Sequence, residues 1–132
     1  MKGLPAELAA VGLGGAIGAS MRYLLSAMTH QMLGHGFPYG TLMVNVVGSL
    51  LIGYLMVLLP ESDSGTPVLR LLLVTGLLGG FTTYSAFSVE TLRLAQTGFP
   101  LRALANIGQT LVLCLAAVWV GYHIGRALHG NG

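Results

Sequence analysis

The sequence predicts an all-α membrane protein with four transmembrane helices, and three observations lead to this fold class. Of the 132 residues, 54% are hydrophobic and only 8% are charged, whereas soluble domains carry about 25% charged residues. The mean hydropathy is +0.77, and the charged residues lie mostly beside four long apolar runs. Each spanning helix needs about 20 residues, so the chain has room for four helices and short linkers. A net charge of +2 is too small and too dispersed to indicate nucleic-acid binding.

The apolar runs and the turn residues between them give the order of the elements. We expect a single transmembrane domain over residues 1–132, with helices at roughly 5–29, 38–60, 67–96 and 100–128. Glycine and proline mark the first linker, the polar sequence ESDSGTP forms the second, and the short sequence TGFP forms the third. Linkers this short join antiparallel neighbours, so we expect consecutive helices to cross the bilayer in alternating directions.

The third apolar run differs from the others because small and hydroxyl residues gather in its middle: Gly76, Gly79, Gly80, Thr82, Thr83 and Ser85. Such a run weakens a helix, so we predict that the third helix is broken near the middle of the membrane. Non-helical backbone at that depth is tolerated only where protein buries it or where it lines a cavity. Close helix packing through small residues is the alternative interpretation.

The positive charges predict no preferred orientation in the membrane. One side carries Lys2, Arg70 and Arg126, and the other carries Arg22, Arg93 and Arg102. Because both sides carry three positive residues, the positive-inside rule predicts no preferred orientation. Two copies inserted in opposite directions can therefore pair as a dual-topology antiparallel homodimer, which is the interpretation we favour. The alternative is that subtler features of the sequence orient the chain.

Neutral polar residues form two stripes at helical spacing: Thr41, Asn45 and Ser49 in the second helix, and Asn106, Thr110 and Cys114 in the fourth. Polar side chains at membrane depth cost free energy, so their position is informative. Two such stripes suit a narrow pathway for a partly dehydrated solute, and their donors favour an anion. Hydrogen bonding between helices is the alternative role.

Two aromatic residues and one arginine add to this pattern. Tyr84 and Phe87 follow the predicted break, and ring edges turned toward a pathway would attract an anion, although packing is the commoner role of such pairs. Arg22 either extends to the membrane surface, which we favour from the sequence alone, or draws anions into a vestibule. Glycine pairs at four-residue spacing (14/18, 76/80 and 121/125) indicate close helix packing.

The ionisable residues argue against catalysis and against proton coupling. Glu90 is the one carboxylate within a predicted helix interior, and it lies toward the end of that helix; His123 also lies near a helix end. With a single cysteine, Cys114, the chain offers no multi-cysteine metal site. We see no nucleophile–base arrangement, so we expect the protein not to be an enzyme.

Three segments, GGAIGASMRY at 14–23, GTLMVNVVGS at 40–49 and GLLGGFTTYSAF at 76–87, together resemble the Fluc (CrcB) fluoride-channel family. Their order and spacing in a four-helix chain make the resemblance specific, and it covers nearly the whole sequence. It implies a dual-topology antiparallel homodimer with two fluoride pores. It also implies a structural sodium ion at the dimer interface, held by the backbone carbonyls of Gly79 and Thr82.

The resemblance also implies roles for individual side chains. Asn45, Tyr84 and Phe87 match pore residues, and Arg22 matches a vestibule arginine. The remaining predicted pore residues are Thr41, Ser85, Asn106 and Thr110. The chain departs from the family pattern at two positions, because Tyr84 replaces the usual phenylalanine and Ala86 replaces a hydroxyl residue. These departures leave the channel identity intact and bear on conductance and pore geometry.

The resulting hypothesis is a passive fluoride-selective channel in the bacterial inner (plasma) membrane that exports fluoride and reduces its toxicity. The membrane potential would drive the anion outward at about 2.3 kcal/mol per charge per 100 mV. The main alternative is a small dual-topology, proton-coupled exporter of drugs or cations. Such exporters depend on an intramembrane glutamate in the first helix, where this chain has only Glu7 near the start. A membrane subunit without transport function would leave the stripes and the break unexplained.

Overall fold

The computed structural model describes residues 2–61 and 67–130 and contains four helices long and apolar enough to cross a membrane. The first two are α1 (Leu4–Leu33) and α2 (Tyr39–Leu58), and the fourth is α6 (Pro100–His129). The third comprises α3 (Val68–Arg70), η1 (Leu71–Leu78), α4 (Gly79–Phe81) and α5 (Tyr84–Gln96). The four-helix prediction is confirmed, whereas most of the second linker, including Asp63, lies outside the described residues.

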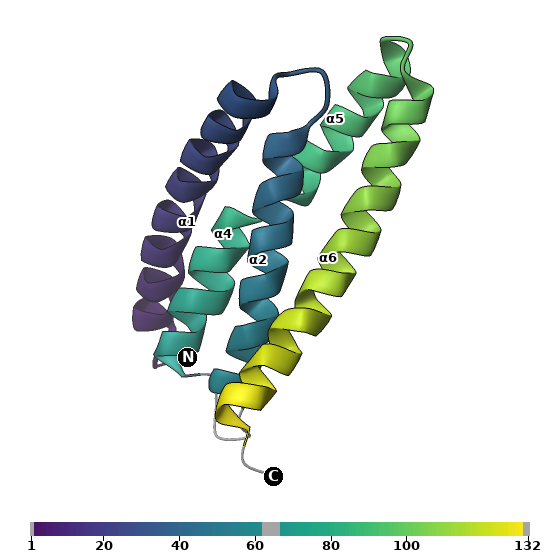
Figure 1. Cartoon of the computed structure of the whole chain (residues 1–132). Helices are drawn as coiled ribbons and strands as arrows, with labels where there is room; N and C mark the ends of the chain where they lie inside the picture. Colours follow the sequence, from purple (N-terminus) through teal and green to yellow (C-terminus); the bar gives the residue numbers. More distant parts are fainter. Residues whose placement is uncertain (1, 62–66, 131–132) are drawn as a thin grey trace.

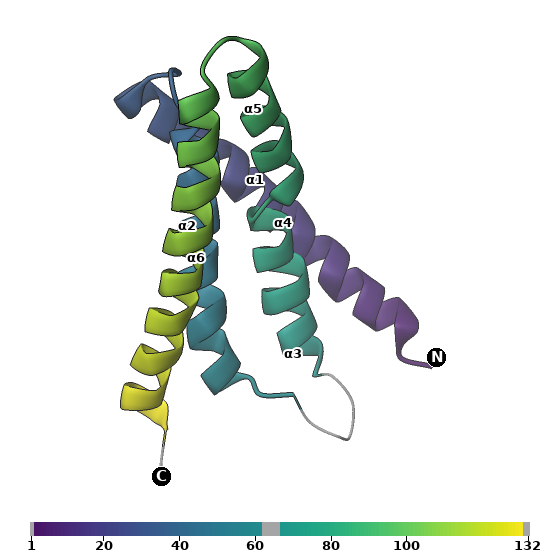
Figure 2. The same ribbon diagram turned by 90° about the vertical axis from the view of Figure 1, so that its right-hand side faces the viewer.

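The helices form an elongated bundle in which both ends of the chain lie at the same end (Figure 1). Helix α2 packs along α6, while α1 packs against η1 and α4 on the other side of the bundle. Figure 2 shows that α1 crosses the remaining helices at a steep angle, whereas α2 and α6 run close together. The α1–α2 loop and the α5–α6 turn lie together at the end opposite the chain termini (Figure 1).

The glycine pairs allow α1 and the third helix to touch through their backbones, as their spacing predicts. A methyl group added at Gly14 would collide with the Leu72 carbonyl oxygen, and one added at Gly18 would collide with the Leu77 carbonyl oxygen. From the third helix, a methyl group added at Gly80 would lie 2.6 Å from the Gly15 carbonyl oxygen of α1. Only glycine permits so close an approach, which lets van der Waals contact hold the helices together in lipid.

This contact gives a prediction for stability. Replacing Gly18 by alanine should force α1 away from η1, because the new methyl group would meet backbone that cannot move aside. We expect a loss of about 1–3 kcal/mol in the free energy of unfolding, measured by SDS titration in micelles. Gly12 is the matched control, since a methyl group there would meet nothing within 4 Å. Equal stability of both alanine variants would contradict the packing assignment.

The predicted break in the third helix is confirmed, and it lies at Thr82 and Thr83. Both residues are extended, with ψ of 159° and 126°, and α5 begins immediately after them. The Thr83 hydroxyl accepts a hydrogen bond from the Ala86 N–H at 3.2 Å, which caps the first turn of α5. Before the break, η1 is a π-helix, and the Gly79 N–H reaches back five residues to the Val74 carbonyl.

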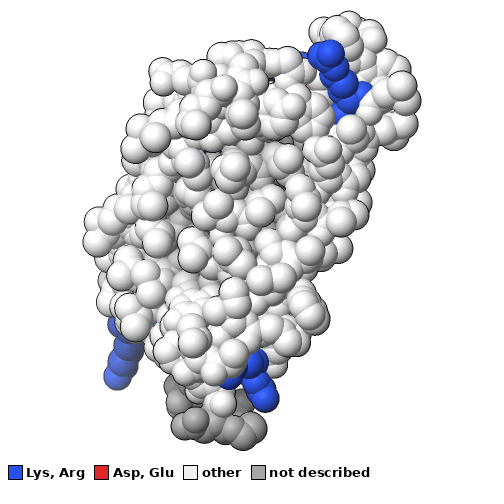
Figure 3. All heavy atoms as spheres, in the orientation of Figure 1, with Lys and Arg blue, Asp and Glu red and all other residues white. Residues whose placement is uncertain are grey.

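The position predicted for Arg22, near the far end of the first helix, is wrong. Helix α1 continues to Leu33 rather than ending near residue 29, so Arg22 lies well inside it. The end of the bundle with the chain termini therefore carries three cationic residues, Lys2, Arg70 and Arg126. The opposite end carries two, Arg93 and Arg102. Figure 3 shows lysine and arginine side chains projecting at the two ends of the visible face, with a wide uncharged surface between them. The orientational bias remains weak.

Candidate ion pathway

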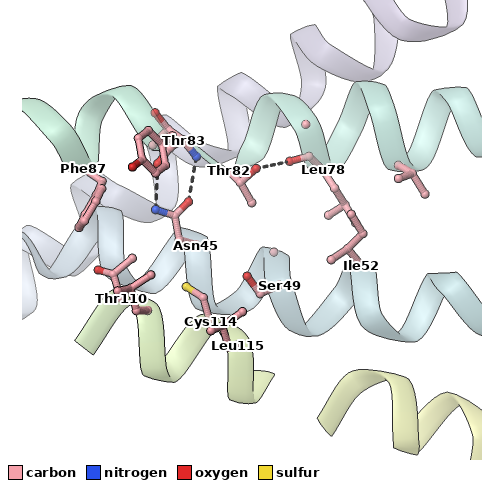
Figure 4. Close-up of a pocket in the computed structure, with 15 residues that line it drawn as sticks. Asn45, Ser49, Ile52, Leu78, Thr82, Thr83, Phe87, Thr110, Cys114 and Leu115 are labelled. Atoms are coloured by element: carbon pink, nitrogen blue, oxygen red, sulfur yellow. Dashed lines mark hydrogen bonds between the residues drawn. The ribbon is translucent and has the colours of Figure 1, made fainter. Parts of the chain in front are cut away.

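A hollow of about 420 Å³ lies beside the break, between α2, the third helix and α6. We call it the central hollow. Its polar and aromatic lining residues are Asn45, Ser49, Thr82, Thr83, Tyr84, Phe87, Thr110 and Cys114. Figure 4 shows Asn45 and Ser49 projecting from α2, and Thr110 and Cys114 from α6, toward the third helix. The structure therefore brings most of both predicted polar stripes to one place.

Asn45 binds the backbone of the break directly. Its amide nitrogen donates to the Thr83 carbonyl at 2.9 Å, and its amide oxygen accepts from the Thr83 N–H at 2.8 Å (Figure 4). These two bonds satisfy both the N–H and the carbonyl of Thr83, at the point where the helix is interrupted. Asn45 is 9% exposed, and a primary amide supplies a donor and an acceptor from one side chain. Its second amide N–H can still donate to another group.

Thr110 carries an unpartnered hydroxyl on the wall of the central hollow. A threonine in a helix usually bonds the carbonyl four residues earlier, as Thr29 does with Leu25 at 2.7 Å. The Thr110 oxygen is buried and has no hydrogen-bond partner among the described residues. Such a group costs free energy unless something binds it. It is therefore available to a solute in the hollow.

The aromatic pair after the break forms one side of the central hollow. The Tyr84 and Phe87 rings lie 5.6 Å apart with an interplanar angle of 60°, an edge-on arrangement. Phe87 is half-buried, whereas Tyr84 is 80% exposed. Tyr84 therefore projects from the chain at the depth of the break, and the hollow is open on that side.

The break also frees backbone oxygens. The Thr83 N–H, which would bond the Gly79 carbonyl in a continuous helix, bonds Asn45 instead. Similarly, the Ala86 N–H bonds the Thr83 hydroxyl rather than the Thr82 carbonyl. Within residues 2–61 and 67–130, the Gly79 carbonyl accepts no hydrogen bond from outside α4, and the Thr82 carbonyl, which lies in the break, accepts none from another backbone N–H. Unwound carbonyls of this kind can bind cations in membrane proteins.

A second hollow, of about 250 Å³, lies between α1, α2 and α5 and contains Arg22, Thr41, Thr83 and Glu90 in its wall. The Thr41 hydroxyl donates to Glu90 Oε1 at 2.8 Å, whereas Glu90 Oε2 is buried without a hydrogen-bond partner in the described ranges. Arg22 Nε donates to the Gly80 carbonyl at 3.1 Å. Arg22 is thus bonded to the end of α4 just before the break, not extended to the membrane surface.

A third hollow, of about 520 Å³, lies at the loop end of the bundle and is named the mouth. Its charged and titratable lining residues are His30, His35, Glu90, Arg93 and Arg102. Glu90 lines both the mouth and the second hollow, and Thr83 lines both the second hollow and the central hollow. The three hollows therefore follow one another from the loop end to the break.

Two predicted pore residues lie elsewhere. Asn106 is 2% exposed, and its amide nitrogen donates to the Thr91 hydroxyl at 2.9 Å, linking α6 to α5. Ser85 is exposed, and its hydroxyl lies 3.3 Å from that of Thr83. Neither residue lines one of the three hollows. Asn106 serves the alternative role considered for the stripes, which is a hydrogen bond between helices.

Glu90 lines two of the hollows but is not among the predicted site residues. It lies in the middle of α5 and is half-buried between the second hollow and the mouth. The signal that could have identified it is a carboxylate within an apolar span, which marks a functional site by default. In the predicted helix over residues 67–96, Glu90 lies toward the end, and this position hides the signal of an intramembrane carboxylate. In the structure, the break makes α5 a separate short helix, and Glu90 lies in its middle.

Comparison with known proteins decides which family has this arrangement. The family model described as CrcB-like protein, Camphor Resistance (CrcB), matches residues 9–122. The chain belongs to the CrcB family. The match includes the glycine pairs 14/18 and 76/80, the break and every residue that lines the central hollow. The resemblance stated from the three sequence motifs is thereby confirmed.

Relatives in the CrcB family are named for an ion-channel activity. The chain is 43% identical over 122 residues to the fluoride-specific ion channel FluC of Citrifermentans bemidjiense, covering 92% of this chain and 98% of the relative. It is 48% identical over 118 residues to that of Sorangium cellulosum, covering 89% and 93%. It is 48% identical over 114 residues to that of Shewanella loihica, covering 86% and 91%. These relatives are channels rather than enzymes, and the chain is a multi-pass membrane protein.

Proposed function

We propose that this chain forms a passive, fluoride-selective channel that exports fluoride across the bacterial plasma membrane. The observation that carries the proposal is a series of three hollows, from a basic mouth to the central hollow with its unpartnered Thr110 hydroxyl, in which each hollow shares a lining residue with the next. Hydroxyl and amide donors at narrow points replace the hydration shell of an anion. The curated relatives named as fluoride-specific channels support fluoride as that anion.

A second copy of the chain would complete the pathway. The central hollow is bounded by one chain and open beside Tyr84, which is 80% exposed at the depth of the break. In a membrane, lipid would fill an open hollow, whereas a symmetric partner would close it. The weak charge bias supports an antiparallel arrangement. The functional unit is thus an antiparallel homodimer with one pathway for each chain, giving two pores.

A sodium ion at the dimer interface fits the break. Sodium is a hard cation that prefers oxygen ligands, and the Gly79 and Thr82 carbonyls are freed by the interruption of the helix. Gly79 is also exposed at the chain surface. Two oxygens from each copy would hold the ion, which would join the two broken helices. The ion is structural and takes no part in the movement of fluoride.

The proposal is tested by fluoride efflux from liposomes, with equal pH on both sides and a potassium gradient with valinomycin setting the potential. We expect rapid efflux that follows the potential and spares chloride. Glu90 makes the proton-coupled alternative worth testing in the same experiment, because it is an ionisable group within a span. Efflux that requires a proton gradient, or no fluoride efflux at all, would refute the channel.

The Thr110 hydroxyl allows a sharp test of the pathway. Thr110→Val keeps the shape of the side chain and removes only the unpartnered hydroxyl. Stability should be unchanged or slightly higher, because no hydrogen bond is lost. Fluoride flux should fall about tenfold to a hundredfold, since a hydrogen bond to a charged group contributes about 1.5–3 kcal/mol.

Thr110→Ser restores the hydroxyl and should restore flux. Thr29→Val is the matched control, because Thr29 is buried in α1, lines none of the three hollows and bonds only its own helix. It should conduct as the unmodified chain does. Full flux through Thr110→Val would remove Thr110 from the pathway.

A further inference from the structure

Two histidines lie in the wall of the mouth. His30 is in the last turn of α1, and His35 is in the loop that follows. Their ring centroids are 5.0 Å apart, and His30 Nδ1 lies 3.2 Å from the Gly34 carbonyl oxygen. Neither ring bonds a carboxylate in the part of the chain that the structure describes. Both rings can therefore gain a proton without breaking an ion pair.

The other charged groups of the mouth come from α5 and α6. Helix α5 contributes Glu90 and Arg93, and α6 contributes Arg102, whose guanidinium donates to the Gly36 carbonyl at 3.2 Å and lies 4.4 Å above the Phe99 ring. Helix α2 begins at the mouth but places no ionisable side chain in its wall. Two arginines and one carboxylate thus leave one net positive charge when Glu90 is ionised and both histidines are neutral.

Histidine is the side chain whose charge ordinarily changes between about pH 5 and pH 8. Protonation of both rings would raise the net charge of the mouth from one to three. A higher positive potential at the end of a pathway concentrates anions there and speeds their capture. Glu90 lies deepest of these groups, at the boundary with the second hollow, so its negative charge opposes an arriving anion.

We propose that His30 and His35 make the mouth a proton-controlled anion-capture site, so that acidification increases the rate at which fluoride enters the pathway. The inference rests on the proposed function and adds to it a regulation of the same channel. It is advantageous in acid, where more fluoride crosses membranes as neutral HF and must be expelled as the anion. Because the two copies of an antiparallel dimer point in opposite directions, each face of the membrane would carry one such mouth.

The test measures fluoride efflux through the full-length channel at a fixed potential. The fluoride concentration is kept below the level that saturates the conductance, so that capture of the anion limits the rate. The pH is equal on both sides and set to about 8 or about 5.5, near the ends of the range in which histidine side chains in general change charge. Efflux from protein-free liposomes is subtracted to remove the leak of HF. At low ionic strength we expect flux to rise about threefold to fivefold on acidification, because two added positive charges attract the anion to the mouth. At about 1 M of an impermeant salt the rise should vanish, because charges are screened within about 3 Å.

The double variant His30→Gln/His35→Gln should lose most of the acid response, measured as the ratio of its own flux at about pH 5.5 to its own flux at about pH 8. His35→Gln alone, in the loop, should lose about half of it and guards against misfolding of the double variant. The matched control is His123→Gln, since His123 is exposed on α6, stacks on Trp119 and lies outside the mouth. It should keep the full response.

The outcomes separate the two proposals. Unmodified protein that conducts no fluoride at either pH would refute the channel itself. Fluoride flux that is present but does not rise in acid, or that rises equally in the double variant, would overturn the role of the histidines and leave the channel standing. A rise that survives high salt would also overturn it, because an electrostatic effect at the mouth must be screened.

Discussion

Asn45→Leu should both destabilise the protein and abolish fluoride flux. Leucine has a similar volume but no polar atoms, so the Thr83 N–H and carbonyl would lose both of their partners. Each unpartnered buried group costs about 1–3 kcal/mol, so we expect a loss of about 2–6 kcal/mol in the free energy of unfolding. The SDS midpoint in micelles and the fluoride efflux rate measure the two effects.

This result would have a different meaning from the one suggested by the sequence. The polar stripe indicates that Asn45 donates to the permeating anion, and loss of flux in Asn45→Leu would then test the pore alone. In the structure, Asn45 also holds the break in its extended conformation. Reduced flux in this variant therefore does not separate a lost donor from a collapsed break.

Two further variants separate these roles. Asn45→Asp keeps an acceptor for the Thr83 N–H and loses the donor to the Thr83 carbonyl, so its stability should lie between those of the unmodified chain and Asn45→Leu. Thr110→Val lacks a donor in the same hollow but breaks no internal bond. If Asn45→Leu proved as stable as the unmodified chain, the clamp on the break would be refuted.

The fold was largely predictable because lipid allows few choices. Apolar runs of sufficient length and glycine-rich contacts specify four packed helices, and a run of glycine and threonine in the third specifies the break. The end of α1 was missed, although Gly34 at φ 83° marks it. Glycine just after the last periodic residue is a helix stop signal, and giving it weight would have placed Arg22 inside the helix.

The site was predictable only in part, because spacing defines a face but not what covers it. Residues four apart drift by about 40° around a helix, so Thr41 and Ser49 of one stripe meet different neighbours. Ser49 lines the central hollow beside α6, whereas Thr41 meets Glu90 of α5. Asn106 and Thr110 diverge in the same way, since only Asn106 lies against Thr91. Which helix faces each residue depends on tertiary packing that no single stripe encodes.

Arg22 gives the second large prediction, because its bond joins α1 to the segment before the break. The Gly80 carbonyl has no partner in its own helix, since α4 ends at Phe81, and Arg22 Nε donates to it at 3.1 Å. Arg22→Ala should therefore cost about 1.5–3 kcal/mol, the usual contribution of a hydrogen bond to a charged group. It should also lower fluoride flux about tenfold or more, because it removes the one cation in the second hollow.

Arg22→Lys distinguishes the two contributions. Lysine retains a positive charge but has only a terminal ammonium, so it cannot donate from the position of Nε along the side chain. We expect it to recover much of the flux and little of the stability, as measured by efflux and by the SDS midpoint. Recovery of both would mean that charge alone matters and that the bond to Gly80 is incidental. Recovery of stability without flux would mean that the geometry of the guanidinium, rather than its charge, serves the anion. Because Gly80 lies between Gly79 and Thr82, the same bond would also fix the carbonyls proposed to bind sodium.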